Sequence, residues 1–326
     1  MRVFSGIQPT GAKHFGNYSG GFRQYAATQD LGEAFFCIVD LHSITVPHDP
    51  EELYEATLDL AAMLLATGID PERSTMFVQS QVPAHAEASW LFACIATMGE
   101  LRRMTQFKEK SHGQDSVSAG LFLYPALMAG DILLYQTDKV PIGDDQRQHL
   151  ELTRDLAERF NTRFGETFKL PEGIYPEIGA RVMDLQEPER KMSTTGGTPQ
   201  GTVGLLDPPD TIRRKFRSAV TDSGKDVVRS PEKPGITNLI EIMAVATGES
   251  PEAVEAHYGG RGYGAFKEAV AEAVVALLDP IRLRYGELRG DPGRLMSILA
   301  AGAERAESIS SETLALAYQR IGFVPR

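Results

Sequence analysis

The stretch that most constrains this chain is Val3 to Gly20, which reads VFSGIQPTGAKHFGNYSG. A short apolar run breaks at Gly6, passes through a Pro9-Thr10-Gly11 turn and reaches His14 and Asn17, where a helix can begin. A strand, a glycine-rich loop and a helix start in this order form the junction at which parallel α/β sheets bind nucleotides, because backbone N–H groups and the helix dipole face the ligand. The loop matches neither GxxxxGK[ST] nor GxGxxG. It therefore predicts phosphate contacts from His14 and Asn17, with an ordinary strand-to-helix loop as the alternative.

Strand and helix patterns alternate over the first part of the chain. Short continuous apolar runs are typical of buried parallel strands, and amphipathic spacing between them is typical of covering helices. We expect strands at 34–42, 75–80, 140–143 and 181–185, and helices at 49–64, 85–98, 119–135 and 148–160. The alternation predicts βαβ units with right-handed crossovers. The expected fold class is α/β, with a Rossmann-like, doubly wound parallel sheet over residues 1–190.

Polar residues follow the expected strands one after another. In a doubly wound sheet the carboxyl ends of the parallel strands face one crevice, where ligands bind. We therefore expect a binding site at this edge, formed by residues 6–8, Asp40, His42, Gln79, Ser80, residues 143–146 and Gln186.

The composition limits the class of protein. A chain of 326 residues exceeds the usual size of a single core, and its hydrophobic content of 42% suits a well-buried interior. The net charge of −11 argues against a general nucleic-acid coat protein but not against a local basic face. Cys37 and Cys94 lie in apolar surroundings, which favours buried thiols in a reducing compartment over a metal site. With no signal pattern and no membrane-length apolar run, we expect a cytoplasmic protein without a membrane partner.

From about Gly201 the strand patterns fade and helical patterns continue, which predicts a second, mostly helical domain over 201–326. Helices are expected to start at 207–210 and to include Ile240, 265–278, 281–288 and 294–321. The first of them carries a basic cluster formed by Arg213, Arg214, Lys215 and Arg217 around Phe216. Such a cluster is either a solvated helix face or a contact for RNA phosphates.

Between the two domains, residues 190–197 read RKMSTTGG, with basic residues, small hydroxyl side chains and paired glycines. Alone, this segment could be any linker. Combined with HFGN at residues 14–17, it resembles the KMSKS and HIGH signatures of class I aminoacyl-tRNA synthetases, and the chain resembles the bacterial tryptophanyl-tRNA synthetase family essentially end to end. Further matching blocks are FSGIQPTG from Phe4, MTQFKEKS from Met104, MAGDILLY from Met128, VPIGDDQRQH from Val140 and KPGITNL from Lys233.

The resemblance implies a reaction and its partners. L-Tryptophan attacks ATP to give tryptophanyl-adenylate and pyrophosphate, and the acyl group then passes to tRNA(Trp). Mg²⁺ is expected with ATP, and no protein-bound metal is expected. The family also implies a homodimer, with a helical insertion at about 84–137 as its interface, although this apolar stretch could equally be core. Residues 191–200 would be the mobile KMSKS-type loop, and 201–326 the helical tRNA anticodon-binding domain.

The resemblance also assigns roles residue by residue. The implied catalytic residues are His14, Asn17, Lys191, Ser193 and Lys110. ATP would contact Gln8, Pro9, Thr10, Gly16, Asn17, Gly143, Asp144, Asp145, Val182, Lys191, Met192, Ser193, Thr194 and Thr195. Tryptophan would contact Asp131, Phe4, His42, Gln106, Tyr124, Met128, Val140, Ile142 and Gln146.

Asp131 carries the expected selectivity. Indole is flat and apolar with one N–H donor, so a single carboxylate in an apolar pocket reads it, and phenylalanine would leave that carboxylate without a partner. A site of this kind rejects the analogue by about 10⁴–10⁵, so no editing domain is needed. The alternative for Asp131 is a solvated acid on a helix, but its apolar neighbours at 121–134 argue against this. The alternative for His42 is a core or capping histidine.

Two residues depart from the family pattern. Thr194 stands where KMSKS has its second lysine, whose contact with pyrophosphate would be worth about 1.5–3 kcal/mol, or about 10- to 100-fold in rate. Lys191, Lys108 or Lys110 would have to supply that charge, or activation is slow. Phe15 replaces the usual aliphatic residue of HIGH. The alternative functions are a tyrosyl-tRNA synthetase, a paralogue that binds tryptophan or RNA without charging tRNA, and a bare adenylyltransferase.

Overall fold

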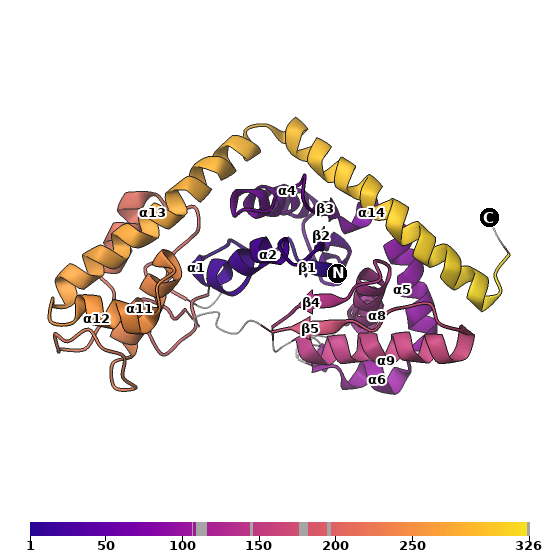
Figure 1. Ribbon diagram of the computed structural model, residues 1–326, viewed down its shortest axis with the longest axis horizontal. Helices are drawn as coiled ribbons and strands as arrows, with labels where there is room; N and C mark the ends of the chain where they lie inside the picture. Colours follow the sequence, from indigo (N-terminus) through magenta and orange to yellow (C-terminus); the bar gives the residue numbers. More distant parts are fainter. Residues whose placement is uncertain (106, 109–115, 144–145, 176–181, 194–196, 325–326) are drawn as a thin grey trace.

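The computed structural model describes residues 1–326 except 106, 109–115, 144–145, 176–181, 194–196 and 325–326. Within these residues the centre is a parallel sheet of five strands in the order β3-β2-β1-β4-β5 (Figure 1). The strands are β1 (Arg2–Ile7), β2 (Glu33–Ile38), β3 (Thr75–Val78), β4 (Lys139–Pro141) and β5 (Glu172–Ile174). Because the chain crosses from β3 to the far side of β1 to form β4, the carboxyl ends of β1 and β4 flank the switch point of the sheet. The expected α/β class is confirmed.

Strand β2 shows how the sheet separates two cores. Every second side chain of a strand faces the same side, and the β2 run from Ala34 to Ile38 is wholly buried. Phe36 and Ile38 join the core on one face of the sheet, and Phe35 and Cys37 join the core on the other face. Both faces are therefore covered, as the continuous apolar run predicts.

Helices cover both faces of the sheet. The first core includes α4 (Pro50–Ala66) and the second includes α5 (Ala84–Ile95), α8 (Ala119–Leu133) and α9 (Arg147–Phe164). Helix α4 begins where expected, because Asp49 accepts hydrogen bonds from two first-turn N–H groups and Pro50 follows it. The shorter elements on this part of the chain are α1 (Phe15–Asn17), a π turn (Tyr18–Phe22), α2 (Arg23–Thr28), α3 (Asp40–Ser43), a 3₁₀ turn (Gln79–Gln81) and α6 (Met98–Arg103).

The strand expected at 181–185 is wrong. The sheet ends instead with β5, which pairs with β4 and is joined to it by an ion pair between Lys139 and Glu172. The described residues 182–185 leave the sheet because the Asp184 carboxylate accepts hydrogen bonds from the N–H groups of Gln186 and Glu187, which turns the chain. Met183 then forms an isolated antiparallel bridge with Lys191.

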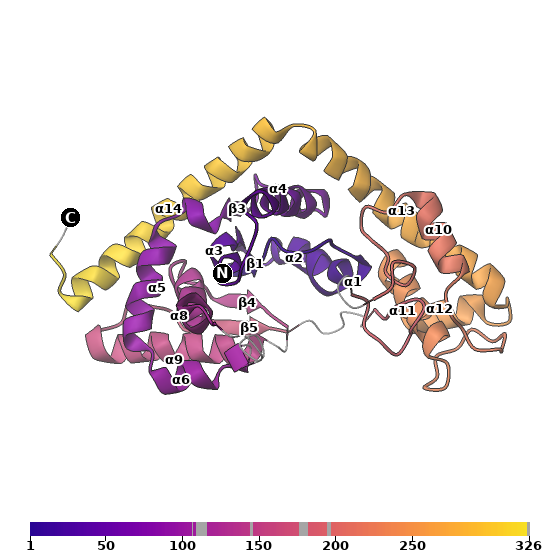
Figure 2. The same cartoon turned by 180° about the vertical axis from the view of Figure 1, so that it is seen from behind.

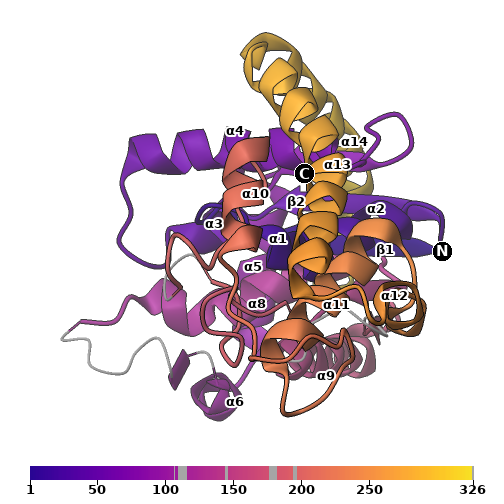
Figure 3. The ribbon, with the colours of Figure 1, turned by 90° about the vertical axis from the view of Figure 1, so that its left-hand side faces the viewer.

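The second part of the chain is helical, as expected. Helices α10 (Pro209–Arg217), α11 (Pro234–Thr247) and α12 (Pro251–Tyr258) gather around α13 (Tyr263–Arg289) (Figure 3). Helix α13 runs unbroken where two helices were expected, at 265–278 and 281–288. A proline removes only one N–H bond from a helix, and the buried stripe of Val274, Leu278 and Ile281 continues across Pro280 into the core.

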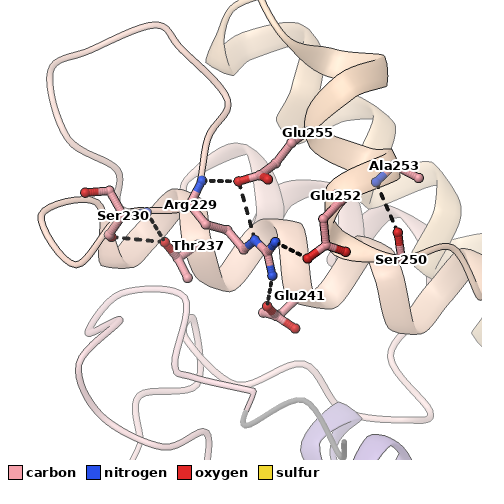
Figure 4. A network of polar contacts seen from close by, with 8 residues as sticks. All are labelled: Arg229, Ser230, Thr237, Glu241, Ser250, Glu252, Ala253 and Glu255. Carbon is pink, nitrogen blue, oxygen red and sulfur yellow. Dashed lines mark hydrogen bonds and ion pairs between the residues drawn. The ribbon is translucent and has the colours of Figure 1, made fainter.

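Arg229 ties the loop before α11 to two helices (Figure 4). Its guanidinium lies 2.6 Å from Glu252 and 3.4 Å from Glu255, both of α12, and 3.5 Å from Glu241 of α11. These carboxylates raise the pKa of Arg229 above its usual value, with the hydrogen bond that Arg229 donates to Glu252 as the largest contribution. The network is structural and lies far along the sequence from the loop between Gly6 and Asn17.

Helix α14 (Pro292–Ile321) returns to the parallel sheet, which the sequence did not predict. It meets α13 near Gly290, and the two long helices form an inverted V over the molecule (Figures 1 and 2). Its Gly302 packs directly on β3, because a β-carbon there would lie 1.8 Å from the Met76 carbonyl oxygen. Among the helices in the described part of the chain, none has the combined length and apolar character that a membrane crossing requires.

This docking makes Gly302→Ala a test of the α14 contact. We expect the substitution to lower the free energy of unfolding by about 1–3 kcal/mol, because the added carbon overlaps the β3 backbone. Gly286→Ala in α13 is the matched control, since nothing lies within 4 Å of its added carbon, and it should be neutral or stabilising by up to about 1 kcal/mol. Urea unfolding measures both variants, and equal stabilities would contradict the docking.

Candidate active site

The two signature loops lie against each other. A β-carbon on Gly16 would lie 3.9 Å from the Met192 β-carbon and 3.0 Å from the His14 ring, so only glycine fits without a shift. The backbone of Phe15 donates to Val203, and His14 bridges Gly204, which fixes the first loop beside the segment that follows the second. The structure therefore brings His14 and Lys191 into one neighbourhood, as the sequence analysis expected.

His14 is a neutral hydrogen-bond donor at pH 7. Burial, then the nearby charges of Lys191 and Lys13, lower its pKa to about 4. Its Nδ1 accepts the N–H of Gly16 at 3.1 Å and so caps α1, which leaves the ring proton on Nε2. Asn17 completes the cap, because its Oδ1 accepts the His14 N–H at 2.9 Å. The Asn17 amide N–H groups are not used by this cap, and they are donors for an anion.

Helix α11 holds the segment that leads to Lys191. The Asn238 side chain accepts the Met183 N–H at 2.8 Å and donates to the Met183 carbonyl at 2.9 Å. Met183 in turn pairs with Lys191, and Met192 donates to Val182 at 3.1 Å. Asn238 belongs to the KPGITNL block, so this block has a positional role that the sequence analysis did not assign. The helical part of the chain thereby places the second signature.

A cavity of about 1020 Å³ opens at the carboxyl ends of β1 and β4. Gly6 and Ile7 line it from β1, and Pro141 lines it from β4. The expected tryptophan contacts that the structure describes all line it: Phe4, His42, Tyr124, Met128, Asp131, Val140, Ile142 and Gln146. Gln8 and Gly143 of the expected ATP set line the same cavity, so residues expected to contact the two ligands adjoin. Lining residues that the sequence analysis did not select include Tyr25, Thr105, Arg147, Gln148 and Glu151.

Asp131 is the buried charge of this cavity. Its carboxylate is 2% exposed and lies 2.8 Å from His42 Nε2, 2.6 Å from Gln79 Nε2 and 2.6 Å from His85 Nδ1. Burial alone would raise the pKa of Asp131, but the hydrogen bonds from His42 and His85 outweigh it and hold the pKa at about 2. The reading of Asp131 as a solvated acid is therefore wrong, and His42 is a donor to Asp131.

The carboxylate keeps one acceptor position. Gln79 and His85 both donate to Oδ1, whereas His42 alone among these three donates to Oδ2. A carboxylate has about four lone-pair positions, two on each oxygen. The Gln79 amide is itself oriented, because its Oε1 accepts the Leu41 N–H at 3.1 Å. The arrangement can thus accept one further N–H from a ligand on the Oδ2 side.

The sequence pattern predicted one of these donors to Asp131 as a site residue and missed another. Gln79 follows β3 directly and belongs to the polar positions expected at the edge of the sheet. His85 was missed as a site residue, because it lies inside an expected helix and nothing in its local pattern separates it from a structural histidine. Its only signal is its place on the first turn of the helix that follows the β3 edge.

Several expected site residues lie outside the described residues: Gln106, Lys110, Asp144, Asp145, Thr194 and Thr195. The large cavity is not lined by the following expected ATP and catalytic residues: Pro9, His14, Gly16, Asn17, Val182, Lys191, Met192 and Ser193. Thr10 lines a separate cavity of about 560 Å³. In the parts of the chain that the structure describes, no three His, Cys, Asp or Glu residues come together as a metal site.

The basic cluster of α10 is half structural. Lys215 is buried and donates to the Thr202 carbonyl at 2.6 Å and to Asp207 at 2.7 Å. Arg213 is bridged to Glu272 at 2.7 Å and to Asp210 at 3.1 Å. Only Arg214 and Arg217 of the cluster are exposed. Neither alternative reading applies to the whole cluster, since part of it holds α10 in place.

The fold and this site define a class of protein. The family model described as tRNA synthetases class I (W and Y) matches residues 1–279. The chain belongs to this class I family of aminoacyl-tRNA synthetases.

The more specific likeness is to tryptophan–tRNA ligases. The ligase of Caldanaerobacter subterraneus subsp. tengcongensis is 52% identical over 100% of this chain and 99% of its own length. The ligase of Listeria monocytogenes is 53% identical over 96% of this chain and 94% of its own length. The tryptophanyl-tRNA synthetase structure from Campylobacter jejuni, complexed with ADP and tryptophan, superposes with a TM-score of 0.86 at 37% identity, covering 99% of this chain and 100% of that one. Tryptophan–tRNA ligation is accordingly the activity of this chain.

The protonation state of His14 has a consequence for stability. Because an unfolded histidine titrates near pH 6.5 and folded His14 near 4, the unfolded chain binds more protons between these values, and stability falls as pH falls through this window. His14→Asn keeps a cap acceptor without a titrating ring, and should reduce that loss by on the order of 1 kcal/mol. Urea unfolding at pH 4 to 7 measures it. Parallel pH profiles for the two proteins would contradict a neutral His14.

Proposed function

We propose that the large cavity binds L-tryptophan with its indole N–H on Asp131 and activates it with ATP. The observation that carries this proposal is the ionised, buried Asp131 with one acceptor position, facing a cavity that also reaches the nucleotide loop. The products are tryptophanyl-adenylate and pyrophosphate, and the acyl group then passes to tRNA(Trp). The Campylobacter jejuni relative crystallised with ADP and tryptophan supports both ligands.

Apolar side chains form the slot for the indole ring. Phe4, Val140 and Ile142 are buried in the wall of the cavity, and Met128 lines it next to Asp131. Phenylalanine in this slot would leave the Asp131 carboxylate buried without a ligand donor. An unpaired buried polar group costs more free energy than a change in apolar contact, so the site should reject phenylalanine. We assign Tyr124 and Gln146 to the ammonium end of the substrate, with Tyr124 held by a hydrogen bond to His149.

The nucleotide lies between the two signature loops in this proposal. Transfer at the α-phosphate needs positioning and charge stabilisation more than a covalent intermediate. His14 and Asn17 supply neutral N–H donors, and Lys191 supplies a positive charge near His14. Mg²⁺ would arrive with ATP and be held mainly by its phosphates. The KMSKS-type loop at 191–200 binds ATP in this proposal. It includes Thr194, which lies outside the described residues.

The helical part of the chain, 201–326, serves tRNA recognition in this proposal, with the catalytic domain at 1–190. Arg214 and Arg217 are candidates for phosphate contacts, because they are the exposed members of the basic cluster on α10, whereas Lys215 is buried. Helix α14 packs on the catalytic sheet, so α10 to α13 are the elements left for RNA.

Pyrophosphate exchange into ATP tests the proposal. The wild-type protein should exchange with tryptophan and not with tyrosine or phenylalanine. Asp131→Asn should lower kcat/KM for tryptophan by about 10- to 100-fold, because a charge-assisted hydrogen bond worth about 1.5–3 kcal/mol is lost, while the KM for ATP changes by less than about threefold. Wild-type protein that exchanges equally well with phenylalanine would overturn the role of Asp131.

We also propose a homodimer through the 84–137 region. Trp90 of α5 is 69% exposed and Met98 of α6 is 59% exposed, and a partner at this region would bury these two large apolar side chains. Trp90 is the only tryptophan in the chain, so its fluorescence reports directly on burial. Dilution should shift the emission to the red as the dimer dissociates, and Trp90→Glu should sediment as a monomer. A wild-type monomer at micromolar concentration would contradict the dimer.

A further inference from the structure

A second hydrogen-bonded layer stands behind the Asp131 carboxylate. His85 of α5 is wholly buried, with Nδ1 2.6 Å from Asp131 Oδ1 and Nε2 2.7 Å from the Tyr135 hydroxyl. Tyr135, two residues beyond α8, is also wholly buried and is not part of the cavity wall. The layer therefore does not touch a ligand in the cavity, and it acts only through Asp131.

The ionised carboxylate fixes the direction of the hydrogen bond between His85 and Asp131. An ionised carboxylate only accepts, so the proton of His85 lies on Nδ1 and points at Asp131. Burial, helped by the charges around it, raises the pKa of Tyr135 well above its usual value, so the phenol keeps its proton. A phenol that keeps its proton can donate to His85 Nε2, which matches an imidazole whose Nδ1 proton points at Asp131.

Aromatic packing holds Tyr135 in this position. Its ring stacks on Phe4 with centroids 5.5 Å apart and contacts Phe35 at 4.8 Å. Phe4 is also a wall of the cavity, so the phenol and the indole slot share one packed ring. From the other side, Ser310 of α14 lowers the pKa of Tyr135 against the larger effect of burial, which places the Ser310 hydroxyl beside the Tyr135 hydroxyl. The line Ser310, Tyr135, His85 and Asp131 thus joins α14 to the cavity.

We infer that His85 and Tyr135 are positioning residues for tryptophan selection: Tyr135 fixes the tautomer of His85, and His85 orients the Asp131 carboxylate toward the indole N–H. This inference rests on the role proposed for Asp131. Orientation matters because Oδ1 must be occupied by protein donors if Oδ2 is to be presented to the ligand. Without His85 the carboxylate keeps Gln79 and His42 but loses one of the two donors on Oδ1.

Other ionisable groups near Asp131 do not replace His85. His42 approaches from α3 and already donates to the other oxygen. Cys37 of β2 is buried, which raises the pKa of its thiol and keeps it neutral. The charges of Asp40, beyond β2, and Glu307, on α14, act on Cys37 and Tyr135 respectively.

Four variants separate positioning from general stability. His85→Leu removes the donor to Asp131, whereas His85→Asn places an amide N–H near the Nδ1 position and should rescue it. Tyr135→Phe keeps the stacked ring and removes only the hydroxyl. Tyr318→Phe is the matched control, since Tyr318 of α14 hydrogen-bonds Glu87 of α5 and so joins the same two helices without reaching Asp131.

Pyrophosphate exchange at pH 4.5 to 8 measures kcat and KM for each substrate. His85→Leu should raise the KM for tryptophan about tenfold and Tyr135→Phe about threefold, with the KM for ATP within twofold of wild type. Asp131 of the wild-type protein stays ionised throughout this pH range, and His85→Leu should bring an acid limb of kcat/KM for tryptophan into it, because Asp131 loses a hydrogen bond that favours its charged form. His85→Asn and Tyr318→Phe should behave like the wild-type protein.

The outcomes separate this inference from the function it rests on. Wild-type protein without tryptophan-dependent exchange would overturn the proposed function itself. Wild-type exchange with an unchanged tryptophan KM and pH profile in Tyr135→Phe and His85→Leu would overturn only the positioning roles. Equal losses in Tyr135→Phe and Tyr318→Phe would also overturn them, because both would then report the α14 contact. If His85→Leu does not fold, as judged by circular dichroism, Tyr135→Phe alone decides.

Discussion

The structure of the site depends on burying one carboxylate. A charge removed from water is tolerated only if hydrogen-bond donors surround it, and the donors to Asp131 come from three separate segments: His42 after β2, Gln79 after β3 and His85 in α5. The fold must therefore bring all three segments next to the Asp131 carboxylate. The parallel sheet achieves this, since its strands end on a common edge. The apolar slot around Asp131 is the space that this arrangement leaves for a flat ligand with one donor.

The nucleotide loops depend on the same edge and on the helical half of the chain. His14 stands at the start of the helix after β1, next to Met192, and residues proposed to contact ATP and the amino acid adjoin where β1 ends. Asn238 of α11 holds Met183, which pairs with Lys191. The second signature is thus placed by contacts from the helical half, and the two halves of the chain share one site.

The sequence predicted the position of the cavity better than it predicted the packing that supports it. Periodicity and post-strand polar residues located the sheet edge, and the family resemblance selected Asp131 and the slot residues that line the cavity. Strand β5 was missed because a short segment with a central glycine has no pattern of its own and is paired only through β4. The burial of Lys215, the return of α14 to β3 and the contact of His85 with Asp131 arise from tertiary packing between distant segments, which local pattern does not encode.

In the proposed site, selectivity for tryptophan comes from one hydrogen bond between the indole N–H and Asp131. The most direct measurement is pyrophosphate exchange by the wild-type protein with tryptophan and with its benzothiophene analogue, in which sulfur replaces the ring N–H at nearly the same shape. We expect kcat/KM to fall by at least about 10- to 100-fold with the analogue, since the buried carboxylate is left with an empty acceptor position. Equal kcat/KM for the two substrates would contradict it.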